Sequence, residues 1–175
     1  ERYLGKVKVP SSILGRGFMR TEKLDGKALS FKIQNELKKE VERLHFHNFK
    51  PTLAAIIVGD DSASEGYVAQ KRKACEEIGA QSEVYRLPPK SGLSALIEKI
   101  EELNKYKRIN GILVQLPLRH LSLPPPVELR EVTYKIMETI DPVKDVDGFH
   151  MLNITKFIRG QECLPPATAQ GVISL

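Results

Sequence analysis

The sequence predicts an α/β fold, a mostly parallel sheet flanked by helices. Three short segments have the length and composition of strands, at 53–58, 82–87 and 111–116. Helical patterns separate them, and the order strand, helix, strand, helix, strand implies right-handed crossovers and parallel pairing. In such sheets ligands bind beyond the carboxyl ends of the strands. We therefore expect functional residues near Gly59 and Gln115, where the first and third strands end.

The first two elements have clear local signals. Apolar residues recur at helical spacing through residues 26–44, after an Asp25 that could cap the helix, so we expect an amphipathic helix there. The run 53–58 is apolar throughout and ends at Gly59, which is typical of a strand buried on both faces.

Caps and a proline bound the later elements. The segment SASE at 62–65 has the form of a capping box, and we expect its helix to stop at Gly79. Residues 94–104 have a helical pattern. Pro117 closes the strand at 111–116, because proline cannot continue a central strand.

Length and composition fit one globular domain. At 175 residues, with 41% hydrophobic and 28% charged residues, the chain has room for one core of ordinary size. No apolar run approaches the roughly 18 residues needed to span a bilayer, so we expect no membrane association. Cys75 and Cys163 lie far apart and neither has a C-x-x-C partner. This supports neither a zinc site nor a disulfide framework, and it favours a reducing compartment.

Part of the net charge of +5 comes from the start of the chain, which is rich in lysine and arginine. We expect residues 1–22 to be a basic leader, either the remnant of a mitochondrial transit peptide or a disordered segment, and residues 23–175 to be the catalytic domain. The basic runs at 38–39 and 71–73 lack the interleaved aromatic residues of nucleic-acid-binding surfaces. Such runs are typical of solvated helix faces, so we expect no nucleic-acid partner.

The segments YVAQK at 67–71 and VQLPL at 114–118 offer a phenol, an amine and an amide. Tyr67 and Lys71 are one turn apart on one helix face. If that face looks into a cleft, the hydroxyl can position the amine, while burial and nearby positive charge would favour the neutral amine that accepts a proton. Gln115 ends an apolar strand, and a buried amide needs a hydrogen-bond partner. The alternative for Lys71 is an exposed lysine beside a half-buried tyrosine, and the alternative for Gln115 is a structural glutamine bonded to a neighbouring loop.

Two carboxylates lie in the segment KDVDG at 144–148. Asp145 and Asp147 flank Val146, so in an extended loop they point to opposite sides and only one can face a ligand. The other would be a structural residue that caps the loop. A metal site built from both carboxylates is an alternative, although no third ligand is evident.

In this order, the three segments resemble the motifs Y-x-x-x-K, V-Q-L-P-L and K-D-V-D-G of the bifunctional methylenetetrahydrofolate dehydrogenase/cyclohydrolase family. The family's fourth motif, P-x-T-P, has its counterpart at 166–169, where Ala169 replaces the last proline. We expect Thr168 to cap the helix that follows. The resemblance covers about residues 23–175, nearly the whole chain.

The resemblance implies roles for particular residues. Lys71 and Gln115 would serve the cyclohydrolase step, Lys71 by activating water and Gln115 by assisting it. Asp147 would anchor the pterin of a tetrahydrofolate substrate, and Asp145 would be structural. The residues expected to line the substrate site are Tyr67, Val114, Leu116 and Pro166.

The family binds NAD or NADP on a Rossmann domain with a Gly-rich turn. The segment GRG at 15–17 follows no strand, so we expect this domain to be absent from the chain. The whole enzyme would oxidise 5,10-methylenetetrahydrofolate, hydrolyse the methenyl product to 10-formyltetrahydrofolate and form a homodimer. The alternative is a catalytically silent folate-binding or interaction module. The phrases VGDDSAS at 58–64 and DGFH at 147–150 resemble the mitochondrial branch, which implies a mitochondrial location, with a cytoplasmic one as the alternative.

The segment between Leu118 and Asp145 is longer than its counterpart in the family. It contains three consecutive prolines at 124–126, followed by a helical pattern at 127–140. The extra length could be a surface loop, an alternative exon or an error of gene prediction. Loops tolerate added length at small entropic cost, so we expect the fold to be kept.

Overall fold

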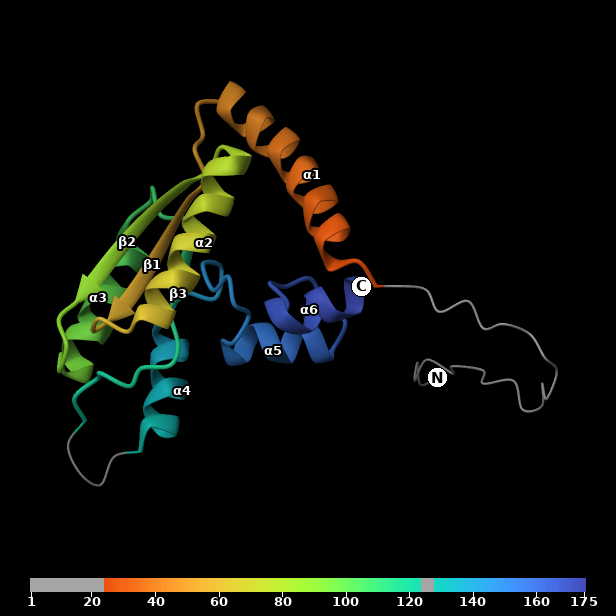
Figure 1. Cartoon of the computed structure of the whole chain (residues 1–175). Coiled ribbons are helices and arrows are strands. Elements are labelled where there is room, and N and C mark those ends of the chain that lie inside the picture. Colours follow the sequence, from red (N-terminus) through yellow and green to blue (C-terminus); the bar gives the residue numbers. More distant parts are fainter. Residues whose placement is uncertain (1–23, 124–127) are drawn as a thin grey trace, which may run out of the picture.

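The computed structural model describes residues 24–123 and 128–175, and it has the expected α/β fold. Three strands form one parallel sheet in the order β2-β1-β3 (Figure 1). The strands are β1 (Thr52–Val58), β2 (Gln81–Leu87) and β3 (Gly111–Val114). The first strand in the sequence is therefore the central strand of the sheet.

Helices connect and flank the strands of the described residues, and their bounds are α1 (Gly26–Phe46), α2 (Ser62–Ile78), α3 (Leu93–Lys105), α4 (Leu129–Thr139), α5 (Met151–Ile158) and α6 (Ala167–Ser174). Helix α2 joins β1 to β2, and α3 joins β2 to β3, because parallel strands need a crossover connection. Helices α5 and α6 lie to one side of the sheet, and α1 projects away from it (Figure 1).

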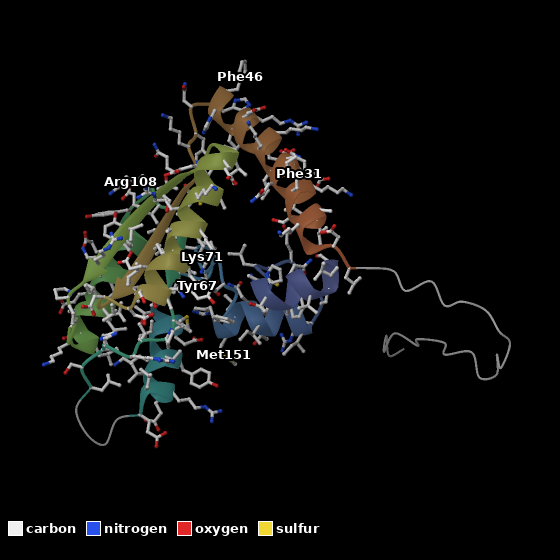
Figure 2. All side chains as sticks on the ribbon, viewed as in Figure 1. Phe31, Phe46, Tyr67, Lys71, Arg108 and Met151 are labelled. Carbon is white, nitrogen blue, oxygen red and sulfur yellow. The ribbon has the colours of Figure 1, made fainter. Side chains whose placement is uncertain are left out.

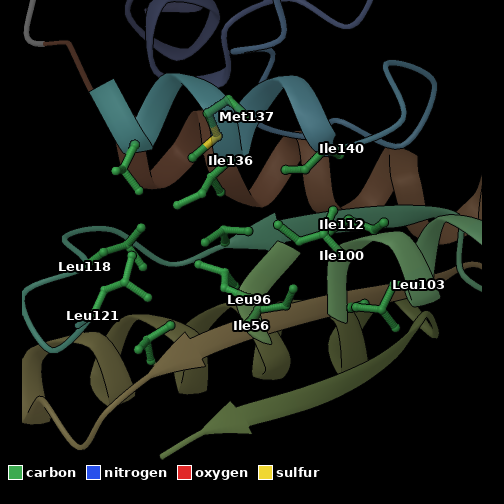
Figure 3. Packing of buried hydrophobic residues seen from close by; sticks show 14 of the residues in the cluster. Ile56, Leu96, Ile100, Leu103, Ile112, Leu118, Leu121, Ile136, Met137 and Ile140 are labelled. Carbon is green, nitrogen blue, oxygen red and sulfur yellow. The ribbon is translucent and has the colours of Figure 1, made fainter. Parts of the chain in front are cut away.

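Side chains alternate along the strands and divide the core into two clusters. On one face, Ile56 and Ile112 belong to the main cluster, which includes the buried residues of α3 and α4 (Figure 3). On the other face, Ile57 and Leu113 pack with Val68 of α2. The alternation therefore decides which strand residues face α2, the helix that carries two of the expected site residues.

The segment 118–145, which is longer than its counterpart in the family, contributes a helix to the core. The helical pattern at 127–140 predicted α4, and the structure confirms it over Leu129–Thr139. Val132, Ile136 and Met137 are buried against the main cluster. The structure does not show which residues make up the extra length, so its three alternative origins stay open, whereas the expectation that the fold is kept is confirmed. The three prolines at 124–126 lie outside the described residues.

The cap of α2 differs from the expected one. Asp61, and not Ser62, occupies the N-cap: its carboxylate accepts a hydrogen bond from the Ser64 backbone N–H at 2.8 Å and another from the Ser64 hydroxyl at 2.8 Å. A carboxylate is the stronger acceptor at a helix N-terminus, since it also interacts with the helix dipole. The helix ends as expected at Gly79, whose φ of +84° is favourable only for glycine.

Two further boundaries were predicted incorrectly. Strand β3 ends at Val114 and not at residue 116. Helix α6 begins at Ala167, so Thr168 lies inside the helix and does not cap it. The reason is a long-range contact: the Ala167 N–H donates to the backbone oxygen of Asp147 at 3.2 Å, which provides the partner that a capping side chain would have offered.

The first helix forms, but few of its side chains are buried by the rest of the described chain. Asp25 caps it as expected, with a carboxylate that accepts from two backbone N–H groups of the first turn. Val41 is its one buried residue, whereas Phe31 and Leu37 are exposed (Figure 2). The amphipathic pattern at 26–44 therefore predicted the helix correctly, while most of its apolar side is open in the described part of the chain.

The burial of α4 generates a stability prediction. Ile136 is fully buried, so Ile136→Ala removes apolar contacts and leaves a cavity that should lower the free energy of unfolding by about 2–5 kcal/mol. Lys135→Ala, at the exposed neighbouring position, should change it by less than about 0.5 kcal/mol. Urea denaturation of both variants measures the difference. Equal stability of the two variants would show that α4 does not belong to the core.

Candidate functional site

The candidate site lies where α2 passes the carboxyl end of β3. Val68 of α2 is buried against the sheet, and this contact fixes how the helix is rotated. Tyr67 and Lys71 lie one turn apart on α2, on the side that looks toward α5 (Figure 2). Gln115 follows β3 and has the same parity as Leu113, so its side chain lies on the face of the sheet that α2 covers.

Lys71 and Gln115 are in contact. The Lys71 ammonium Nζ donates to Gln115 Oε1 at 3.4 Å, a long hydrogen bond. The Gln115 amide Nε2 donates to the Leu116 carbonyl at 2.7 Å, and the Gln115 backbone N–H donates to the Ile56 carbonyl at 2.9 Å. Gln115 is thus held through its side-chain Nε2 and through its backbone N–H, and its Oε1 is directed at the lysine. The two residues expected to act together are brought together across 44 positions of sequence.

Tyr67 is placed differently from the lysine. Its side chain is 58% exposed, and within the described residues no hydrogen bond joins its hydroxyl to Lys71. The lysine is held by the amide of Gln115 instead of by the phenol. Tyr67 therefore offers an exposed aromatic ring beside the amine, a surface on which a planar ligand can stack.

Asp145 is the structural carboxylate of the pair. It is 1% exposed. Its Oδ1 accepts from the Gly148 N–H at 3.1 Å, and its Oδ2 accepts from the His150 N–H at 2.8 Å and from Asn153 Nδ2 at 3.0 Å. Three donors, two from the loop and one from α5, therefore converge on this buried carboxylate, so its hydrogen bonds are made within the protein.

Asp147 lies on the Lys71 side and is half-buried. Burial raises the pKa of its carboxyl above the ordinary value; the Lys71 ammonium opposes this shift and the Asp145 carboxylate adds to it. The charged neighbour of Lys71 is thus a carboxylate, and not the second positive charge that we expected. The opposite placement of Asp145 and Asp147 agrees with the alternation predicted for an extended loop.

The remaining expected lining residues have different surroundings. The side chain of Val114 is 1% exposed and belongs to the main core cluster, because it has the opposite parity to Gln115; its place in the substrate site stays a prediction. Leu116 is half-buried beside that cluster. Pro166 comes close to the KDVDG loop: Gly148 has a φ of +70°, and a Cβ there would lie 2.5 Å from the Pro165 carbonyl. Only glycine allows this approach.

Two residues with clear structural roles were not predicted. Lys144 donates to three backbone carbonyls near the end of α3, those of Leu103, Asn104 and Tyr106. The side chain of Asn153 is buried and donates to Asp145 and also to the Pro142 carbonyl at 2.8 Å. The partners of Lys144 lie about 40 positions away, so no local pattern shows this role.

The described residues do not fit a dinucleotide. The turn from β1 to α2 resembles a phosphate-binding turn in one respect only, since Gly59 has a φ of +86°. Two acids follow it, and the Asp61 carboxylate already occupies the helix N-terminus where a pyrophosphate would bind. A second anion there would be repelled. The segment GRG at 15–17 and the leader at 1–22 lie outside the described residues.

In the two described stretches, no three His, Cys, Asp or Glu side chains come together in a group that could hold a metal ion. Within the same stretches, no helix combines the length and the apolar composition that crossing a bilayer requires.

Comparison with solved structures supports the fold. The structure matches a bifunctional FolD methylenetetrahydrofolate dehydrogenase/cyclohydrolase from Campylobacter jejuni with a TM-score of 0.76 and 42% identity, over 85% of this chain and 50% of that one. It also matches a Trypanosoma brucei methylenetetrahydrofolate dehydrogenase-cyclohydrolase, complexed with NADP cofactor and inhibitor, with a TM-score of 0.74 and 31% identity, over 87% of this chain and 50% of that one.

Comparison with curated proteins gives the same relatives. The chain is 46% identical over 158 residues to the bifunctional protein FolD of Acetivibrio thermocellus, a match that covers 90% of this chain and 52% of the relative. The chain thus spans about half the length of the curated relatives it matches. Acetivibrio thermocellus is a bacterium, so the match to its protein does not support assignment of this chain to the mitochondrial branch.

A family model extends over the elements that form the site. The model described as "Tetrahydrofolate dehydrogenase/cyclohydrolase, catalytic domain" matches residues 24–147, from the start of α1 to Asp147. This range includes Lys71, Gln115 and the loop that carries the two carboxylates. With the sheet, the contact between Lys71 and Gln115 and the relatives in agreement, the chain belongs to the tetrahydrofolate dehydrogenase/cyclohydrolase family.

Proposed function

We propose that this chain is the catalytic part of a methylenetetrahydrofolate dehydrogenase/cyclohydrolase and that its own residues perform the hydrolysis of 5,10-methenyltetrahydrofolate. The contact between Lys71 Nζ and Gln115 Oε1, with Asp147 on the same side, carries the proposal. This arrangement brings together a base (Lys71), a polar group that orients the base (Gln115) and a hydrogen-bond acceptor for the ligand (Asp147). The relatives named FolD and the match to the family's catalytic domain support it.

The hydrolysis needs one proton acceptor and one proton donor. The neutral amine of Lys71 takes a proton from water as the water oxygen bonds to the bridging carbon of the methenyl group, and the C=N electron pair moves to nitrogen. The bond from that carbon to N5 then breaks, its electron pair goes to N5, and Lys71 returns its proton to N5. The hydroxyl proton of the adduct leaves to water as the carbonyl of 10-formyltetrahydrofolate forms. Gln115 assists by holding the amine through its Oε1. Its own position is fixed by its bonds to Leu116 and Ile56.

The substrate would be anchored by Asp147. Its carboxylate can accept hydrogen bonds from the amino and ring N–H groups of a pterin, and it attracts the positive charge of the methenyl group. Tyr67 would stack on the folate through its exposed ring, while Leu116 and Pro166 would form apolar edges of the site. The side chain of Val114 is buried, so Val114 would border the ligand through its backbone.

The oxidation of 5,10-methylenetetrahydrofolate would use NAD or NADP bound outside the described residues, since these do not fit a dinucleotide. That misfit favours a second candidate, a module that binds folate and does not convert it. A turnover assay beside a folate titration distinguishes the two, because the silent module binds without hydrolysis. Homodimer formation by the whole protein, and a mitochondrial instead of a cytoplasmic location, stay predictions from the resemblance.

Lys71 provides the first test. Lys71→Met keeps the apolar stem and removes the amine, so hydrolysis of methenyltetrahydrofolate should fall by on the order of 100-fold or more, within the range for a positioned general base. The absorbance of the methenyl group follows the reaction. Lys73→Met, on the exposed side of the same helix, serves as the control. Unchanged turnover in a folded Lys71→Met protein would sink the assignment.

The two carboxylates should respond differently to the same substitution. Asp147→Asn should weaken the binding of a reduced folate by about 10- to 100-fold, equivalent to roughly 1.5–3 kcal/mol, because a charge-assisted acceptor is lost. Asp145→Asn should mainly lower stability, since a buried carboxylate with three bonds loses its charge. Fluorescence titration and thermal denaturation measure the two effects. The reverse pattern would mean that the carboxylates were assigned to the wrong sides.

The raised pKa of Asp147 adds a pH dependence to this test. The folded carboxyl binds its proton more tightly than the unfolded one, so its contribution to stability is full below the ordinary value of 3.8 and is lost as the pH rises through the raised pKa. Asp147→Asn avoids this loss. The variant should therefore gain thermal stability relative to the native chain as the pH rises from 4 toward neutrality.

Cofactor binding provides a separate test. Hydride transfer requires a nicotinamide held beside the folate carbon, and the helix N-terminus that directly follows β1 and the positive-φ Gly59 is closed by Asp61. The chain of 175 residues should therefore show no saturable binding of NAD or NADP and no dehydrogenase activity. Calorimetric titration with each dinucleotide checks this. Micromolar binding would return the segment GRG at 15–17 to consideration.

A further inference from the structure

The loop that carries Asp147 contains no helix or strand of its own. It runs from the end of α4 to the start of α5 and lies along the edge of β3 that no other strand covers. There the Ile112 N–H donates to the Lys144 carbonyl at 2.7 Å, and Ile112 and Asp145 form an isolated parallel bridge. This pairing with the sheet extends over one bridge only, so the loop depends also on turns of its own backbone, on the Ala167 N–H that donates to the Asp147 carbonyl, and on side chains.

Nothing in the described residues holds the Asp147 carboxylate directly. Among the hydrogen bonds of the described residues, none reaches its oxygens, although its backbone carbonyl accepts from Ala167. The Lys71 ammonium acts on it through charge without forming an ion pair in this part of the chain. The direction in which the carboxylate points is therefore set by the backbone of the loop.

Lys144 fixes one end of this loop to α3. Its Nζ donates at 3.2 Å to the Leu103 carbonyl, at 2.7 Å to that of Asn104 and at 3.0 Å to that of Tyr106. These carbonyls belong to the last turn of α3 and the residue that caps it, where the helix dipole is negative; those of Leu103 and Tyr106 also accept from backbone N–H groups. An ammonium has three donors, and all three are used.

The other end of the loop is fixed to α5. Asp145 accepts from Gly148, His150 and Asn153, and Asn153 also donates to the Pro142 carbonyl. The loop is thus held on both sides of Val146, which packs against Gly111 so closely that a Cβ on that glycine would lie 2.5 Å from it. Asp147 follows directly, on the opposite side from Asp145.

We propose that Lys144 is a positioning residue for the folate site: by holding the loop on the C-terminal end of α3, it directs the Asp147 carboxylate toward Lys71. Lys144 touches neither the ligand nor the reacting atoms. The proposal rests on the proposed function in one respect, the role of Asp147 as the folate anchor. It assigns Lys144 no part in activating water, which the Lys71 and Gln115 pair performs from a different element.

A double-mutant cycle tests the proposal. Lys144→Met keeps the stem and removes the three donors. It should weaken the binding of 5-formyltetrahydrofolate, a stable reduced folate, by roughly 5- to 10-fold, within the range of couplings between residues of one network. In the Asp147→Asn background the same change should cost less than about 2-fold, because the group that it positions is gone. A residue that only stabilises the fold would give independent, additive effects, and additivity overturns the proposal.

A second measurement needs no ligand. The pKa of Asp147, followed by NMR of its carboxyl carbon, should move from its raised value toward the ordinary one in Lys144→Met, because the loop becomes more solvated and turns from its surroundings. Lys105→Met removes an exposed ammonium from the last turn of the same helix and should leave the titration unchanged. An unchanged pKa of Asp147 in Lys144→Met contradicts the proposal, even if the variant is less stable.

The two readouts separate the failure of this proposal from failure of the proposed function. Normal folate binding by Asp147→Asn would reject the anchor role while the NMR titration still decides whether Lys144 directs the carboxylate. Weak binding by Asp147→Asn combined with an additive effect of Lys144→Met would keep the anchor and reject the positioning. If Lys144→Met does not fold, Lys144→Gln retains two donors and replaces it, with the same expected direction of both readouts.

Discussion

Parallel pairing of β3 with β1 decides which residues form the site. In the paired register, Val114 lies opposite Ile56, and the next backbone N–H, that of Gln115, donates to the Ile56 carbonyl. Because side chains alternate, Val114 enters the core beneath α3 and α4, while Gln115 turns toward α2 and meets Lys71. A shift of one residue in this register would exchange the two side chains and separate the amide from the amine.

The polar side of the site depends on a different kind of constraint. Asp147 lies on a loop with one backbone bridge to the sheet, and a loop of this length has many conformations open to it. Its conformation is selected by polar groups that all find partners: the buried carboxylate of Asp145, the buried amide of Asn153 and the half-buried ammonium of Lys144. Each would be costly if left unpaired in the interior, so the loop has one arrangement that satisfies all of them.

Local sequence patterns predicted the helices and strands well, but they predicted the contacts between these elements less well. Apolar periodicity located α1, α3 and α4, and continuous apolar runs located β1 and β3, because burial imposes those periods directly on the sequence. The alternation rule also placed Asp145 and Asp147 on opposite sides. The errors involve partners that are distant in sequence. Thr168 was expected to cap α6, but the backbone of Asp147 provides that contact. Strand β3 was expected to extend to residue 116, but it ends at Val114, where the Gln115 N–H donates to the Ile56 carbonyl.

Asp61, at the N-terminus of α2, determines which kind of ligand this edge of the sheet can bind. A helix N-terminus after a parallel strand is the usual site for a phosphate, yet here Asp61 satisfies the Ser64 N–H and brings a negative charge of its own. Arg119 and His120 lie near enough to lower the pKa of Asp61 further, after the hydrogen bonds from Ser64, so the carboxylate stays ionised near neutral pH. The sheet edge is therefore suited to a ligand with N–H donors at the KDVDG loop, and unsuited to a pyrophosphate at α2. The contact of Lys71 with Gln115 and the carboxylate of Asp147 support the proposed hydrolysis, whereas the carboxylate of Asp61 opposes the binding of a pyrophosphate at the start of α2.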